Sequence, residues 1–238
     1  VLIDTQFTLA DAEKVAQEIK KSGKKLTTIF VSHGDPDFYF GLEVFKKYFP
    51  EVTAYATPAT IEHIKATNQK KLDVWGERLG KNITSNVILP QVLKGNSIEL
   101  EGHHLEIVGL QEFPSQTFVW IPSIKAVVGG INVFGTTFHL WMADAQTTEA
   151  RKNWISVLDK ITALNPEIVI PAHAKSDSPF DMTAVNHTKT YIQFYEEALI
   201  TNTTSEALIT ALKTKYPTLT FETGLQIGAK VNTGEMKW

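Results

Sequence analysis

Cysteine is absent from the 238 residues of this chain. The absence excludes disulfide bonds, thiolate metal sites and a cysteine nucleophile. It says nothing of the compartment, because a chain without thiols tolerates an oxidising and a reducing environment alike. The compartment stays open, with the cytoplasm as the working expectation.

Long apolar runs and an excess of charge of one sign are also missing. No apolar run approaches the ~20 residues that are needed to span a bilayer. The formal net charge is -3, from 23 basic and 26 acidic residues, so neither a basic surface for nucleic acid nor an acidic tail is indicated. We expect a small-molecule substrate, no nucleic-acid or membrane partner, and a homodimer as the option for self-association.

Several catalytic signatures do not occur in the sequence. There is no Gly-x-Ser-x-Gly nucleophile elbow, no glycine-rich phosphate loop that ends in Lys-Ser or Lys-Thr, and no His-Glu-x-x-His helix. Gly129 and Gly130 alone are too weak a signal for a dinucleotide site.

The pattern of apolar residues predicts an α/β protein. Buried strands at 2–5, 26–31 and 52–56 each precede a helix, short antiparallel strands fill 98–128, and helices with one strand return from 150 to 199. We expect one domain over 1–203 and a helical extension over 204–238 that packs on it, with a helix at 205–215 and then a tail without clear period. The opening residues resemble the end of a strand, which suggests that further strands precede them.

Two of the buried strands deliver a histidine into the loop that follows. His33 comes after the strand that ends at Val31, and His173 comes after the strand that ends at Ile170. Functional groups collect at the carboxyl ends of strands in open α/β sheets. We therefore expect the two histidines, one from each half of the chain, to face one site.

The loop after the first of these strands has His33, Asp35 and Asp37 at alternate positions. In an extended loop such side chains point to one side, and imidazole and carboxylate are metal-ligand types. The other interpretation is a loop that begins a helix, in which Asp35 caps the helix, Asp37 favours its dipole and His33 is only hydrogen-bonded. The spacing alone leaves both interpretations open.

The run from Val31 to Gly41, Val-Ser-His-Gly-Asp-Pro-Asp-Phe-Tyr-Phe-Gly, resembles the His-x-His-x-Asp-His motif of the metallo-β-lactamase superfamily. The segments that lie where this superfamily has its other motif elements are 2–5, 111–115, 127–130 and 170–173. The resemblance covers roughly residues 1–200 and implies an αββα sandwich, with two mixed sheets flanked by helices.

The resemblance also implies a metal site that is partly rewritten. His33, Asp37 and His173 keep the residue of the superfamily, and Asp35 and Glu112 replace histidines. These five side chains are the expected ligands of one divalent metal ion, for which zinc, manganese and iron are all compatible with the donors. Asp37 is also the expected catalytic residue, which would orient or deprotonate a metal-bound water.

Two further positions of the motif carry no donor atom. Phe38 replaces a histidine and Gly130 replaces the bridging aspartate of the superfamily, so one metal rather than two is expected. Three interpretations stay open: a metal-dependent hydrolase of an ester, lactone, amide or phosphoester; a metal-free protein that holds a ligand without turning it over; and a scaffold for a protein partner. In the metal-free case, the carboxylates would repel one another without a cation.

His139 is the second candidate catalytic residue, because it follows the region that carries the bridging aspartate in the superfamily. It would act as an acid, a ligand or a substrate contact, or else it is a loop histidine beside a packed tryptophan. His63 and His187 lie on predicted helices without an acidic or histidine partner four residues further on, which favours a structural role. Trp75 is expected either to line a substrate pocket or to lie in the core.

Overall fold

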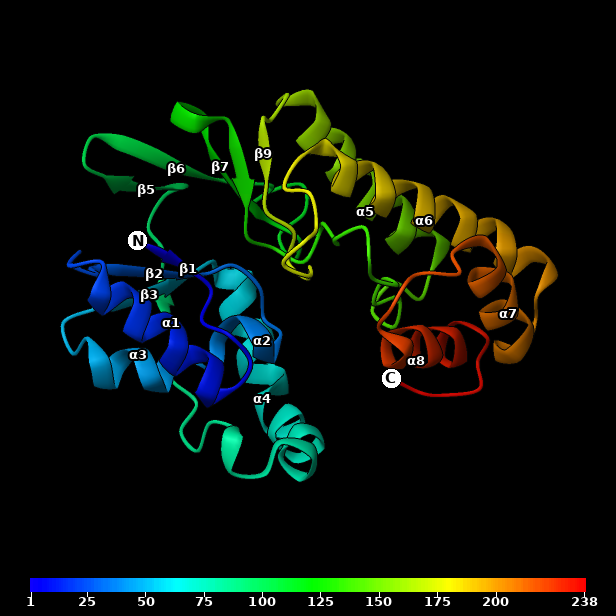
Figure 1. The fold of residues 1–238 in the computed structure, drawn as a ribbon, viewed down its shortest axis with the longest axis horizontal. Coiled ribbons are helices and arrows are strands. Elements are labelled where there is room, and N and C mark those ends of the chain that lie inside the picture. The colour runs from blue at the N-terminus through cyan, green and yellow to red at the C-terminus, as the bar shows by residue number, and fades with distance from the viewer. The chain divides into compact units, whose positions relative to one another are not determined.

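The computed structural model describes residues 1–238. It confirms the α/β architecture, with two sheets flanked by helices. The chain divides into two compact units, Val1–Trp120 and Ile121–Trp238, and each unit buries its own set of apolar side chains. Figure 1 shows the elements of both units along the chain.

A parallel sheet organises the first unit. Its strands run in the order β1 (Leu2–Ile3), β2 (Thr28–Val31), β3 (Thr53–Ala56) and β4 (Gln91–Val92). The last three residues of β2 are fully buried, so both faces of this strand are covered. The predicted strands at 2–5, 26–31 and 52–56 are therefore confirmed with shorter bounds.

Capping residues begin the two longest helices of this unit. The side chain of Thr8 accepts the Asp11 backbone N–H and starts α1 (Leu9–Lys21). Thr57 does the same for Thr60, and Pro58 occupies the first turn of α4 (Pro58–Leu79), where its missing N–H costs nothing. Between them, α3 (Leu42–Tyr48) packs beside α1, as Figure 1 shows.

An antiparallel meander completes the first unit. It consists of β5 (Ser97–Leu100), β6 (His103–Val108) and β7 (Phe118–Ile121). Glu101 and Gly102 join β5 to β6 with positive φ angles of 52° and 84°, the backbone of a tight hairpin turn. The predicted antiparallel character of these strands is confirmed.

Four helices and a short parallel strand pair form the second unit. The pair is β8 (Ala126–Val128) with β9 (Ile168–Val169). The helices α5 (Thr148–Ala163) and α6 (Met182–Thr201) run side by side (Figure 1). They are followed by α7 (Ser205–Lys215) and α8 (Glu222–Asn232).

After α7, where a tail without clear period was expected, the structure has the helix α8. Small residues form much of its buried face, among them Gly224, Gly228 and Ala229. A Cβ atom on Gly228 would lie 3.1 Å from the Cβ of Met142, so the helix packs through its backbone. Leu225 and Val231 share this buried face, so a helical period was present in the sequence and was overlooked.

The segment 204–238 packs within the second unit. The Tyr195 hydroxyl on α6 donates to the Gly228 carbonyl on α8, and Glu235 accepts from the backbone and side chain of Ser205. The expected division of the chain at residues 203 and 204 stays a prediction. None of the helices combines the length and the apolar character that a membrane span requires.

Gly41 tests the packing that holds the start of α3 against the loop after β1. Its φ and ψ of -68° and -9° suit any residue, but a Cβ atom there would lie 1.8 Å from the Thr5 carbonyl oxygen. We expect Gly41→Ala to lower the free energy of unfolding by about 3 kcal/mol, because the backbone of the loop must move. Urea denaturation followed by circular dichroism measures the change.

The matched control is Gly76→Ala in α4, where an added Cβ meets no atom within 4 Å. This variant should be stabilised by about 0.5–1 kcal/mol, since alanine is the better helix residue. Equal stability of the two variants would contradict the close approach at Gly41.

Candidate functional site

The loop that carries the sequence motif begins a short helix. His33 follows β2, and Asp35 occupies the N-cap position of α2 (Pro36–Tyr39) with Asp37 in the first turn. The backbone therefore follows the helix-starting interpretation rather than an extended loop. The side chain of Asp35, however, makes no capping hydrogen bond, so it is available for another partner.

That partner is Lys71, which reaches the loop from α4. Its Nζ lies 2.7 Å from Oδ1 of Asp35, 2.8 Å from the carbonyl oxygen of Gly34 and 3.0 Å from Nε2 of His63. A protonated lysine has three N–H donors and no acceptor, so each proton of the ammonium group has one acceptor. The Lys71 and Asp35 side chains are only 17% and 18% exposed, which limits the screening of their attraction by water.

His63 completes the shell as a neutral acceptor. Burial and the nearby charge of Lys71 lower the pKa of His63. Because the ammonium group can only donate, Nε2 of His63 must accept, and the ring proton is assigned to Nδ1. The ring lies against the motif loop so closely that a Cβ atom on Gly34 would be 2.5 Å from its Cδ2, which explains the glycine at this position.

Asp35 carries the negative charge of the cluster. Burial raises the pKa of its carboxyl group, but His33 and the Lys71 ammonium group outweigh this effect and leave the pKa below its usual range. On its other side, the backbone N–H of Asp35 donates to Nδ1 of His33 at 3.2 Å. The loop thus joins His33, Asp35, His63 and Lys71 in one network.

Phe38 fills the motif position at which the superfamily has a histidine. Its side chain is 4% exposed, and its ring meets the His33 ring edge-on at 5.1 Å between centroids. It therefore supports His33 by packing and brings no donor atom.

Asp4 holds the start of the same loop. Its carboxylate accepts the Ser32 backbone N–H at 2.7 Å and the Ser32 hydroxyl at 2.6 Å. Burial raises the pKa of Asp4 to about 7, although the two hydrogen bonds from Ser32 act in the opposite direction. The carboxylate is thus costly to keep charged, and this position was not identified from the sequence.

In the second unit, His173 and His139 are packed against aromatic rings. The His173 ring stacks on Phe134, with centroids 5.0 Å apart and planes 14° from parallel. Nδ1 of His139 lies 3.0 Å from the Tyr191 hydroxyl, and the side chain is 1% exposed. Burial lowers the pKa of His139 to about 4, so the ring is neutral at neutral pH. A catalytic role for His139 stays a prediction.

The expected metal ligands are only partly brought together. Glu112 lies in the exposed loop between β6 and β7, and no three His, Asp or Glu side chains within either unit are grouped so that they could hold a metal ion. His33 and His173 belong to different units, so their convergence on one cavity stays a prediction.

His63 and Lys71 were not predicted from the sequence as members of the site. The prediction of a merely structural role for His63 rested on the absence of a partner four residues further on. Lys71 instead lies eight residues away, about two helical turns along α4, and the carboxylate that joins them is Asp35 in another element. The available signal was a histidine and a lysine two turns apart on one predicted helix.

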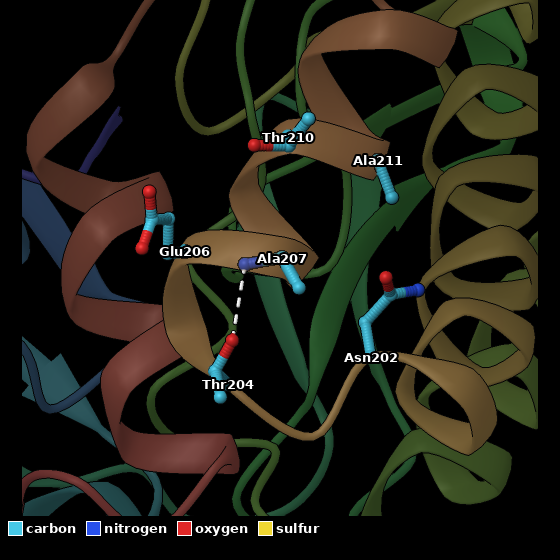
Figure 2. A pocket seen from close by; sticks show the side chains of 6 residues that line it. All are labelled: Asn202, Thr204, Glu206, Ala207, Thr210 and Ala211. Carbon is cyan, nitrogen blue, oxygen red and sulfur yellow. Dashed lines mark hydrogen bonds between the residues drawn. The ribbon is translucent and has the colours of Figure 1, made fainter.

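A hollow elsewhere in the second unit contains none of the expected site residues. Figure 2 shows it at the start of α7, where the Ala207 N–H donates to the Thr204 side chain. The residues that line it are Asn202, Thr204, Glu206, Ala207, Thr210 and Ala211. The motif loop is therefore the better candidate for function.

Solved structures provide the comparison with known proteins. The chain aligns with a metallo-β-lactamase from Pontibacter korlensis at a TM-score of 0.54, with 19% identity and 80% of each chain covered. It aligns with the DIM-1 metallo-β-lactamase at a TM-score of 0.56, with 20% identity over 80% of this chain and 79% of that one. The chain has the metallo-β-lactamase fold. No protein-family model and no curated protein sequence matches it.

The metallo-β-lactamase fold was thus predicted correctly from the motif elements. Identities of 19% and 20% show the fold alone, since one fold supports many activities. The residues around Asp35 do not fit the metal ion that this fold implies, because the Lys71 ammonium group already lies against Oδ1. A divalent cation bound there would meet a second positive charge at close range.

Asp4→Asn tests the charge beneath the motif loop. An asparagine keeps the bond from the Ser32 N–H and removes the titrating group. Because the folded state raises the pKa of Asp4 from 3.8 to about 7, the wild type gains stability from this group at low pH and loses it as the pH rises towards 7. Between pH 5 and pH 8, we expect the wild type to lose about 2–3 kcal/mol that the variant keeps.

Urea denaturation of both proteins at the two pH values measures this difference. The contributions of all other titrating groups to the pH dependence are the same in both proteins and cancel in the comparison. Parallel pH profiles of the free energy of unfolding would therefore show that the pKa of Asp4 is not raised in the folded state.

Proposed function

We propose that this chain is a metal-free small-molecule-binding protein with the metallo-β-lactamase fold. The observation that carries the proposal is the Lys71 ammonium group, which is hydrogen-bonded to Asp35, Gly34 and His63. Its charge removes the need for a metal to balance Asp35.

Electrostatics supports this proposal over the other interpretations. Without a cation, the carboxylates of the motif loop would repel one another, and this was the physical objection to a metal-free site. Lys71 supplies that cation from within the chain, at hydrogen-bonding distance from Asp35. Phe38 is buried against His33. Its side chain has no donor atom, so it cannot contribute a ligand to a second metal.

A pair of aromatic rings supports an apolar group on the ligand. Trp75 follows Lys71 by four residues on α4, so both side chains project from the same face of the helix. The Trp75 ring meets Phe7 edge-on at 5.1 Å, and both residues are only partly buried. A small molecule at this face of α4 would meet the Trp75 ring together with the Arg78 guanidinium group, which lies over the ring at 5.1 Å from its centroid.

The second candidate function is a hydrolase that uses one metal ion. It is favoured by His33, Asp37 and His173, which keep the residues of the superfamily motif, and by the fold of the solved relatives. When bound, such a metal would supply an activated water for an ester, lactone, amide or phosphoester. Asp37 and His139 are the proposed catalytic residues in that case, and Glu112 a proposed ligand.

Metal analysis separates the two functions. Protein purified without added metal, and again after incubation with Zn²⁺ or Mn²⁺ and dialysis, should contain far less than one equivalent of metal. It should also leave a panel of esters, lactones and phosphoesters unchanged, with or without the added ions.

The hydrolase would give the opposite result. About one equivalent of metal, absent from both His33→Ala and Glu112→Ala, would overturn the metal-free proposal. So would hydrolysis that a chelator abolishes and Zn²⁺ or Mn²⁺ restores.

A further inference from the structure

We infer that Asp35, Gly34 and His63 form a cation-binding site that the chain occupies with the ammonium group of its own Lys71. The site lies entirely within the first unit, between the motif loop and α4. It differs from the ligand set that the sequence motif implies, because His63 and the Gly34 carbonyl oxygen are not part of that set. The inference relies on the proposed function only for the statement that the wild-type site is metal-free.

The three acceptors are arranged around one point. Oδ1 of Asp35, the Gly34 carbonyl oxygen and Nε2 of His63 lie 2.7, 2.8 and 3.0 Å from Nζ of Lys71. Carboxylate, carbonyl and imidazole are all ligands of divalent transition metals. Metal–ligand bonds of about 2.0–2.2 Å would need each acceptor to move inward by less than about 1 Å.

The acceptors are also in the protonation states that a metal requires. Oδ1 of Asp35 and Nε2 of His63 both accept from the Lys71 ammonium group, so each presents a lone pair to the site. Metal binding would therefore release no proton from either side chain.

Contacts other than those of Lys71 also hold the site. Gly34 allows the His63 ring to lie directly on the loop, since a Cβ atom there would be 2.5 Å from the ring. Asp4 fixes the start of the loop through Ser32. The Lys71 ammonium group occupies a site that its neighbours form. A shorter side chain at position 71 would leave this site open to an external cation.

The test is Zn²⁺ binding by Lys71→Ala, measured by isothermal titration calorimetry and thermal unfolding. We expect about one equivalent of Zn²⁺ to bind, and Tm to rise by about 5–10 °C at a concentration hundredfold above Kd. The wild type should show neither effect at the same concentrations. Lys70→Ala is the matched control, because it removes the same charge from the adjacent, exposed position of α4 and should behave like the wild type.

A double variant assigns the site. Adding His63→Ala to Lys71→Ala should abolish the Zn²⁺-dependent rise in Tm. If Lys71→Ala folds and binds no Zn²⁺, or if the double variant still binds it, the inference is wrong. If Lys71→Ala does not fold alone, the inference requires that Zn²⁺ restores its circular dichroism spectrum.

The outcome for the proposed function can be read separately. Metal in the wild type would overturn the metal-free proposal, whatever the variants do. The cation site would still stand if Lys71→Ala gained a further equivalent that depended on His63. It would fall if Lys71→Ala and the wild type bound the same amount.

Discussion

The attraction between the Lys71 ammonium group and the Asp35 carboxylate is the interaction on which the motif loop depends. Asp35 is held between β2 and α2, and Lys71 comes from the middle of α4. Removal of one partner of a largely buried pair leaves a charge without compensation, at a cost of about 3–5 kcal/mol for full burial. The remaining partial exposure of both side chains reduces that cost, but the sign is unchanged. Gly34 and His63 both serve this ion pair. The glycine leaves room for the histidine ring, and the ring accepts a hydrogen bond from the ammonium group.

In this protein, the residues that indicate the fold are not the ones on which the proposed chemistry depends. The metallo-β-lactamase fold was evident from five short segments, and the structural alignments agree with it. In the proposed function, the chemistry depends instead on which cation neutralises the motif loop, and the candidate cation is Lys71, which lies outside all five segments. A protonated lysine donates three hydrogen bonds and has no acceptor, so in this form it cannot serve as the general base for a water. The same backbone can thus present a binding site in one chain and a metal centre in another.

Local patterns predicted the elements well where one physical cause dominates. The run from Leu26 to Val31 is apolar because β2 is covered on both faces, and Thr57-Pro58 begins α4 through a cap and a fixed φ angle. Helix α8 was overlooked although Leu225, Ala229 and Val231 lie on its buried face at helical spacing. The site was harder to predict than the elements. Asp35 and Lys71 are 36 residues apart, and the sequence around either residue does not indicate that the other is its partner. An ion pair between distant elements leaves no periodic pattern in the sequence, so it becomes visible only in the folded structure.

The protonation of His63 tests the account most directly. Two-bond ¹⁵N–¹H correlation spectra of the histidine rings, recorded on the wild type at neutral pH, distinguish the two neutral tautomers and the charged form. We expect a neutral His63 ring with the proton on Nδ1 and a lone pair on Nε2 that accepts from Lys71, and this pattern should be lost in Lys71→Ala. A His63 ring protonated on Nε2, or a spectrum identical in wild type and variant, would contradict it.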